Sequence, residues 1–80
     1  MNVSVDISYY PLKEDFIKPI DDFIEKLNQN QAISVETGKL STVLMGEYTM
    51  VMKLLTESMG DLMTRYPSVF TVKITNYCPT

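Results

Sequence analysis

The sequence predicts an α+β sandwich in which a four-stranded antiparallel sheet carries two helices on one of its faces. Apolar and polar residues alternate along four segments, which is the period of a half-buried strand. Apolar residues recur at helical spacing along two longer segments, which is the period of an amphipathic helix. The segments follow in the order β-α-β-β-α-β. With 80 residues, 45% of them hydrophobic, the chain is expected to form one domain over residues 1–80.

The first strand is predicted over residues 3–10, where four apolar or aromatic residues alternate with more polar ones. The inward set is Val3, Val5, Ile7 and Tyr9. Pro11 lacks a backbone N–H and is expected to end the pairing. A helix is predicted over residues 15–29 with Asp15 as its N-cap, because Pro19 then falls in the first turn, where proline is tolerated.

Two short strands are predicted over residues 32–37 and 41–47, and the turn residue Gly38 between them indicates a hairpin. Gly46, near the end of the second of these strands, indicates a bulge or a close approach of another segment to the backbone.

A second helix is predicted over residues 49–66, with Thr49 as its N-cap and Pro67 after its end. The last strand is predicted over residues 69–77, where alternation resumes. Right-handed crossovers and a short hairpin join these elements into a βαββαβ, or ferredoxin-like, sandwich.

The sheet face opposite the helices is expected to be rich in small hydroxyls and carboxylates, with a small apolar patch. Its expected members are Ser4, Asp6, Ser8, Tyr10, Ser34, Glu36, Ser41, Val43, Met45, Glu47, Thr71, Lys73 and Thr75. This face is either a solvated outer surface or a surface that pairs with another subunit and lines a pocket for a small polar cation. Tyr10 is the candidate stacking platform for a heteroaromatic ring.

Composition excludes several classes of function. The chain has no histidine and a single cysteine, Cys78, so it can form neither an intrachain disulfide nor a Cys/His zinc site, and it has no histidine catalysis. The net charge of −3 and the scattered lysines argue against nucleic-acid binding.

No apolar run reaches the roughly 18 residues of a membrane span and no leader opens the chain, so we expect a cytoplasmic protein. A core this small favours self-association.

Three carboxylates on the open face, Asp6, Glu36 and Glu47, could serve general acid–base chemistry or bind a hard metal ion. They rest on predicted strand faces and form no catalytic motif, and no nucleophile elbow is present. Ligand binding is therefore the favoured role, and neither catalysis nor a metal site is predicted.

Four segments, VDISYYPL, FIKPIDDFIEKL, SVETGKLSTVLMGEYTMVM and VFTVKI, together resemble the YkoF-like thiamine-binding proteins. The resemblance covers nearly the whole chain. Its most specific part is Thr37-Gly38, followed by Ser41-Thr42 and then by Gly46-Glu47.

The resemblance implies a ferredoxin-like fold, assembly into homodimers or homotetramers through the sheets, and a cytoplasmic location. It also implies a non-enzymatic protein without a cofactor that binds thiamine or its hydroxymethylpyrimidine portion for vitamin uptake or salvage. The ligand-binding positions that it implies are Tyr10, Thr37, Ser41, Thr42 and Glu47. An aminopyrimidine suits hydroxyls, a carboxylate and a tyrosine, and an acidic pocket favours a thiazolium cation.

The first hypothesis is thus a small-molecule binding protein, in which Glu47→Ala or Thr42→Val lowers the affinity for the ligand. The alternative is a homo-oligomeric structural or regulatory module without a small-molecule ligand. A third hypothesis, an enzyme acting through carboxylates, requires that Asp6, Glu36 and Glu47 converge.

Overall fold

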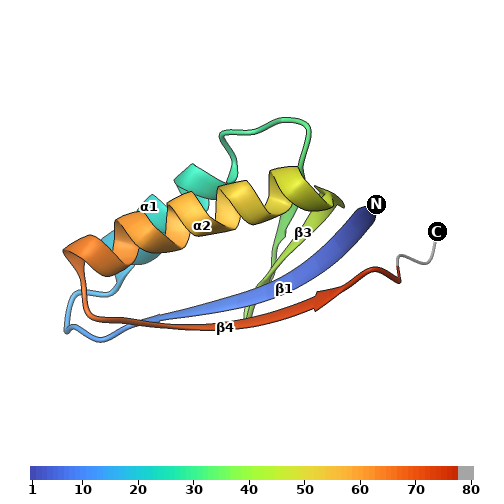
Figure 1. The fold of residues 1–80 in the computed structure, drawn as a ribbon. Helices are drawn as coiled ribbons and strands as arrows, with labels where there is room; N and C mark the ends of the chain where they lie inside the picture. Colours follow the sequence, from blue (N-terminus) through green and yellow to red (C-terminus); the bar gives the residue numbers. More distant parts are fainter. Residues whose placement is uncertain (78–80) are drawn as a thin grey trace.

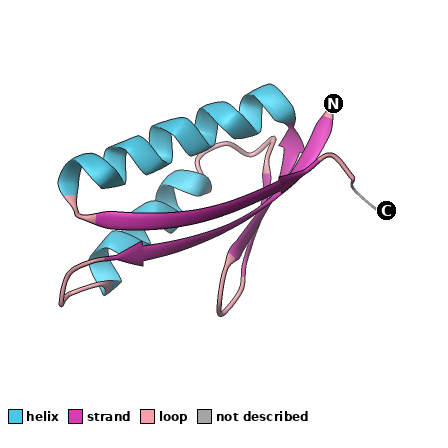
Figure 2. Ribbon diagram, turned by 60° about the horizontal axis from the view of Figure 1, so that its bottom comes forward, coloured by secondary structure: helices cyan, strands magenta, loops and turns pink. Residues whose placement is uncertain are grey.

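The strands form one antiparallel sheet with the order β2-β3-β1-β4 in a computed structural model that describes residues 1–77. The elements are β1 (Asn2–Pro11), α1 (Ile17–Leu27), β2 (Ser34–Thr37), β3 (Thr42–Glu47), α2 (Tyr48–Arg65) and β4 (Ser68–Thr75). Both helices lie on the same side of the sheet (Figures 1 and 2). The predicted ferredoxin-like α+β fold is confirmed. Cys78 lies outside the described residues.

The hydrophobic core lies between the sheet and the two helices. The central strand β1 contributes Val3, Val5 and Ile7, each no more than 2% exposed, as the alternation predicted. The other buried apolar residues are Phe23, Leu27, Ile33, Leu44, Val51, Leu54, Leu55 and Leu62. Removing apolar surface from water is the main stabilising contribution, at about 1.5–3 kcal/mol for each large side chain that is fully buried.

The sheet narrows along the length of β1. Pairing of β1 with β3 ends at Ile7 and Thr42, whereas pairing of β1 with β4 continues to Pro11 and Ser68. The far ends of β1 and β4 therefore extend beyond the hairpin of β2 and β3 as a two-stranded ribbon (Figure 2). We call the place where β3 ends beside β1 the sheet step.

Both predicted helix caps are wrong. The helix α1 begins at Ile17 with Phe16 in the N-cap position, because its first backbone hydrogen bond joins the amide of Ile20 to the carbonyl of Phe16. No side chain of residues 1–77 caps this helix start. Asp15 therefore lies one residue too early to cap it. The helix α2 begins at Tyr48, and its N-cap is Glu47, whose carboxylate accepts a hydrogen bond of 3.1 Å from the amide of Met50.

The predicted strand boundaries are correct to within two residues. β2 begins at Ser34, although Ile33 before it is buried, and β4 ends at Thr75. The close approach predicted at Gly46 is confirmed: a Cβ atom there would lie 3.3 Å from side-chain atoms of both Ile33 and Val51. Glycine therefore lets α2 and the segment before β2 pack directly on β3.

The edge strand β4 is only partly covered by the helices. Val72 and Ile74 pair with the buried residues Ile7 and Val5, so they lie on the helix side of the sheet. They are nevertheless 41% and 47% exposed. An apolar flank beside an edge strand is a surface on which another strand can pair.

Candidate ligand site

A cavity of about 520 Å³ lies on the open face of the sheet at the sheet step. We call it the open-face cavity. It is lined by Asp6, Ser8, Tyr9, Tyr10, Lys39, Leu40, Ser41, Thr71 and Lys73. The lining comes from β1, from β4 and from the connection between β2 and β3. Its volume lies within the range of about 300–1,000 Å³ that small-molecule sites occupy.

The connection between β2 and β3 forms one wall of the open-face cavity. Its turn is closed by a hydrogen bond of 2.9 Å from the amide of Gly38 to the carbonyl of Ser41. The hydroxyl of Ser8 donates to the carbonyl of Leu40 at 3.3 Å, which holds the turn against β1 beyond the end of β3. The side chain of Leu40 is 90% exposed, so the turn presents an apolar group at the cavity rim.

A smaller cavity of about 140 Å³ lies on the other side of the same connection. We call it the helix-side cavity, because Ile20, Phe23 and Ile24 of α1 contribute to its lining. Thr37 and Thr42 also line it, and they face each other as a cross-strand pair. The residues that the two cavities share are Ser8, Tyr9, Lys39, Leu40 and Ser41.

The structure brings four of the five predicted ligand-binding residues to the sheet step. Tyr10 and Ser41 line the open-face cavity, whereas Thr37 and Thr42 line the helix-side cavity together with Ser41. Glu47 lies at the opposite end of β3, five residues or roughly 17 Å from Thr42, and it lines neither cavity. Its carboxylate instead caps α2.

The predicted ligand-binding positions do not include the charged groups of the open-face cavity, which are Asp6, Lys39 and Lys73. Asp6 and Lys73 are cross-strand neighbours on β1 and β4. Within residues 1–77 these three groups make no ion pair. Asp6 and Lys73 each alternate with apolar residues along a strand, so the sequence predicts both on the open face. Lys39 lies in the connection between β2 and β3, and it comes beside them only because β3 ends at the sheet step.

The three open-face carboxylates do not converge. Asp6 and Glu36 are each paired with Val43, on its two sides, so two strand spacings of about 4.8 Å separate their backbones. Glu47 lies farther along β3. In the described part of the chain, no group of three or more His, Cys, Asp or Glu side chains could hold a metal ion. The geometry that the carboxylate-enzyme hypothesis required is absent from residues 1–77.

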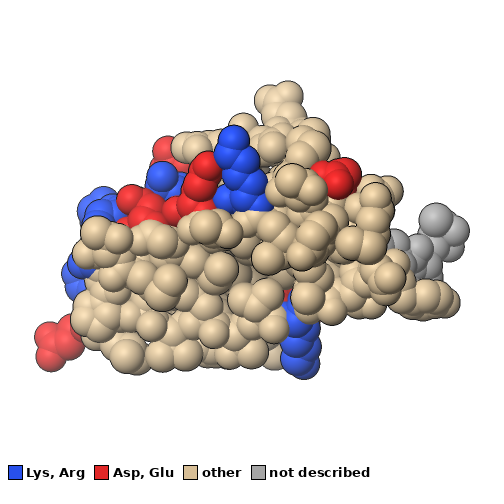
Figure 3. Space-filling view, in the orientation of Figure 1, with Lys and Arg blue, Asp and Glu red and all other residues tan. Residues whose placement is uncertain are grey.

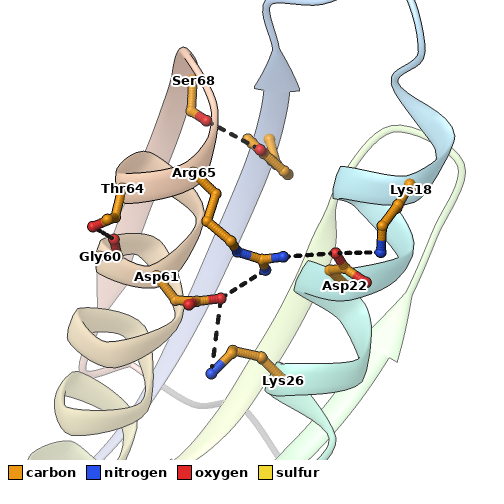
Figure 4. Close-up of polar contacts among 9 residues, drawn as sticks. Lys18, Asp22, Lys26, Gly60, Asp61, Thr64, Arg65 and Ser68 are labelled. Atoms are coloured by element: carbon orange, nitrogen blue, oxygen red, sulfur yellow. Dashed lines mark hydrogen bonds and ion pairs between the residues drawn. The ribbon is translucent and has the colours of Figure 1, made fainter.

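A second group of charged residues joins the two helices on the opposite side of the molecule (Figure 4). Arg65 of α2 contacts Asp22 of α1 at 3.1 Å and Asp61 at 2.7 Å, and Asp61 also lies 3.8 Å from Lys26. Lys18 contacts Asp22 at 3.4 Å. Most of the charged side chains visible in Figure 3 gather over the helices in the same way. These charges are paired with one another, which favours a structural role.

The pKa of Asp22 carries a testable consequence of this network. Burial raises this pKa, but hydrogen bonds from Arg65 and Lys18 together with their charges outweigh burial, so the pKa lies below its ordinary value of 3.8. A carboxyl whose pKa is lower in the folded state stabilises the fold above its unfolded pKa, and this stabilisation is lost as the pH falls through the folded pKa.

We therefore expect Asp22→Asn to reduce the acid sensitivity of the fold. Thermal unfolding midpoints should be measured for wild type and variant between about pH 6 and pH 2. The wild type should have the higher midpoint near pH 6, and the two midpoints should converge near pH 2. Asp21→Asn is the matched control, because Asp21 is exposed and makes no ion pair within residues 1–77. A constant difference between wild type and Asp22→Asn at every pH contradicts the expected linkage.

Fold and site together define a ferredoxin-like domain with one open sheet face and a cavity of small-molecule size. The family model described as the YKOF-related family matches residues 2–80. The chain belongs to this family, which confirms the resemblance found in the sequence. No curated protein matches the chain.

Several solved structures share the fold over nearly the whole chain. Protein SP2199 from Streptococcus pneumoniae is 26% identical with a TM-score of 0.86, and the match covers 94% of this chain and 86% of that chain. TM0486 from Thermotoga maritima, provisionally assigned to thiamine biosynthesis or salvage, is 26% identical with a TM-score of 0.84 over 96% and 85% of the two chains. MJ1052 from Methanocaldococcus jannascii is 23% identical with a TM-score of 0.83, over 99% of this chain and 84% of that chain, and it supports the fold alone.

No helix within residues 1–77 has both the length and the apolar character that crossing a membrane requires.

Proposed function

We propose that this protein is a non-enzymatic, cytoplasmic binding protein for thiamine or its hydroxymethylpyrimidine portion, and that it serves uptake or salvage of the vitamin. The observation that carries the proposal is the open-face cavity, where a tyrosine, several hydroxyls and a carboxylate meet at the sheet step. Membership of the YKOF-related family and the thiamine-related assignment of TM0486 support the choice of ligand.

The chemistry of the cavity suits an aminopyrimidine. Tyr10 is 53% exposed, and its ring offers a flat face on which a heteroaromatic ring can stack. The carboxylate of Asp6 can accept hydrogen bonds from an exocyclic amine and attract a cationic ring, a role that the family resemblance implies for Glu47. The hydroxyls of Ser41 and Thr71 can donate to ring nitrogens or accept from an amine.

Titration calorimetry with thiamine and with hydroxymethylpyrimidine tests this proposal. We expect saturable binding that Tyr10→Leu weakens by about 2- to 10-fold, the equivalent of one aromatic contact. Tyr77→Leu is the matched control, because Tyr77 is exposed and lies outside both cavities. Glu47→Ala should lower the melting temperature through loss of the α2 cap and leave the affinity unchanged. Absence of heat and of a melting shift with either compound at millimolar concentration contradicts the proposal.

We further propose that the protein is a homodimer or homotetramer that assembles through its sheets. Support comes from the edge strand β4, where Val72 and Ile74 are exposed, and from the open-face residue Met45, which is 42% exposed. A broad uncharged area also extends from α2 toward β4 in Figure 3. If assembly is the whole function, the protein is a structural or regulatory module. Light scattering at micromolar concentration tests assembly: a monomer mass contradicts it, and an oligomer that binds neither compound favours the module.

A further inference from the structure

The open-face cavity has a net positive set of side chains although the protein as a whole is acidic. Lys39 and Lys73 contribute two ammonium groups and Asp6 one carboxylate, whereas the whole chain has a net charge of −3. In the network between the helices each positive charge has a carboxylate partner, but neither cavity lysine has one within residues 1–77. Two lysines without carboxylate partners favour a ligand that carries an anionic group as well as a ring.

The two lysines enter the cavity from opposite sides. Lys39 belongs to the connection between β2 and β3, on one side of β1, and Lys73 belongs to β4, on the other side of β1. Two strand spacings of about 4.8 Å therefore separate the lines of backbone that carry them. Because each ammonium group stands on a flexible four-carbon stem, both can reach one anionic group bound above β1.

Hydroxyl donors complete the surroundings of such a group. Within residues 1–77 the side chains of Tyr10, Ser41 and Thr71 make no hydrogen bond, so their hydroxyls are available to a ligand. Asp6 is the one carboxylate of the lining and repels an anion, so an anionic group must sit nearer the lysines while an amine or cation of the same ligand faces Asp6.

We propose that the open-face cavity takes a phosphate monoester whose other end is a cationic or amino-bearing heteroaromatic ring, with Lys39 and Lys73 binding the phosphate and Asp6 the ring substituent. The choice of ring rests on the proposed function. The phosphate-binding site is the new inference, and it makes phosphorylated thiamine the preferred ligand over thiamine itself.

Titration calorimetry with thiamine, thiamine monophosphate and inorganic phosphate tests this inference. Thiamine monophosphate should bind about tenfold or more tightly than thiamine, and its advantage should shrink as the salt concentration rises. Lys39→Gln and Lys73→Gln should each remove most of that advantage, measured as the ratio of the two affinities for the same variant. Lys53→Gln is the matched control, because Lys53 is an exposed lysine of α2 outside both cavities and without an ion pair within residues 1–77.

The three ligands separate this inference from the proposed function. If thiamine binds and its monophosphate binds no more tightly, the phosphate site is refuted and the proposed function stands. If thiamine does not bind but the monophosphate and inorganic phosphate bind and depend on both lysines, the phosphate site stands and the ring assignment falls. If none of the three binds, or if Lys53→Gln weakens phosphate binding as much as the cavity variants, the inference is overturned.

Discussion

Phe23→Ala is expected to cost about 3–5 kcal/mol of unfolding free energy, the range for removal of a buried aromatic ring from a packed core. Phe23 is 2% exposed, and its ring lies 5.2 Å from that of Tyr9 and 5.3 Å from that of Phe70. A domain of this size has a total stability of roughly 4–12 kcal/mol, so the loss is a large share of the whole. The thermal midpoint should fall by more than about 12 °C, which circular dichroism will record.

Phe16→Ala provides the matched comparison, because it removes the same ring from a side chain that is 53% exposed. A surface change of this kind should alter the unfolding free energy by no more than about 0.5 kcal/mol. Urea unfolding of both variants will separate the two effects. Equal losses from the two variants would show that the ring of Phe23 does not have the buried position that the structure gives it.

The same aromatic cluster links the core to the candidate site. The ring of Tyr9 stacks on Phe70 at 4.4 Å and meets Phe23 edge-on, while its hydroxyl lies 3.0 Å from that of Ser68. Tyr9 also contributes to the walls of both cavities. Packing of Tyr9 in the core therefore fixes the floor of the sheet step, so a ligand bound there would meet a largely preformed surface.

Most of the fold could be predicted from the sequence because its periodic signals are strong. Strict alternation over residues 3–10 gives both the strand β1 and its buried face, and the switch to helical spacing after Asp15 separates strand from helix. The helix ends were harder. Thr49 and Asp15 have side chains that often cap helices. The N-cap, however, is the residue that precedes the first helical turn, and the backbone hydrogen bonds put Phe16 and Glu47 at that position.

The candidate site was predictable only in part, because it depends on where strands end. Alternation assigns Tyr10 and Asp6 to the open face without knowledge of the register. The cavity exists because β3 stops opposite Ile7 while β1 continues, and this offset between strands has no local sequence signal. Glu47 lies on the open face, as the alternation predicts, but its place at the end of β3 puts it far along the sheet from both cavities.

Ser58→Ala is expected to stabilise the protein, an effect opposite in sign to that of Phe23→Ala. Ser58 of α2 is 1% exposed, and its hydroxyl has no hydrogen-bond partner within residues 1–77. Leaving a buried polar group unpaired costs about 1–3 kcal/mol, and alanine removes that group without leaving a large cavity. Alanine also has the higher helix propensity. Urea unfolding should therefore give a higher midpoint for the variant.

Ser68→Ala makes the same chemical change at a serine whose hydroxyl is paired, and it should have the opposite result. The hydroxyl of Ser68 donates to the carbonyl of Tyr66 at 2.9 Å and accepts from the hydroxyl of Tyr9, so alanine leaves two part-buried partners unsatisfied. We expect a loss of about 1–2 kcal/mol. The sign of each effect follows from hydrogen bonding, since both variants lose one oxygen atom. If Ser58→Ala destabilises the protein as Ser68→Ala does, the hydroxyl of Ser58 has a partner in solution, and a buried water molecule is the group to look for.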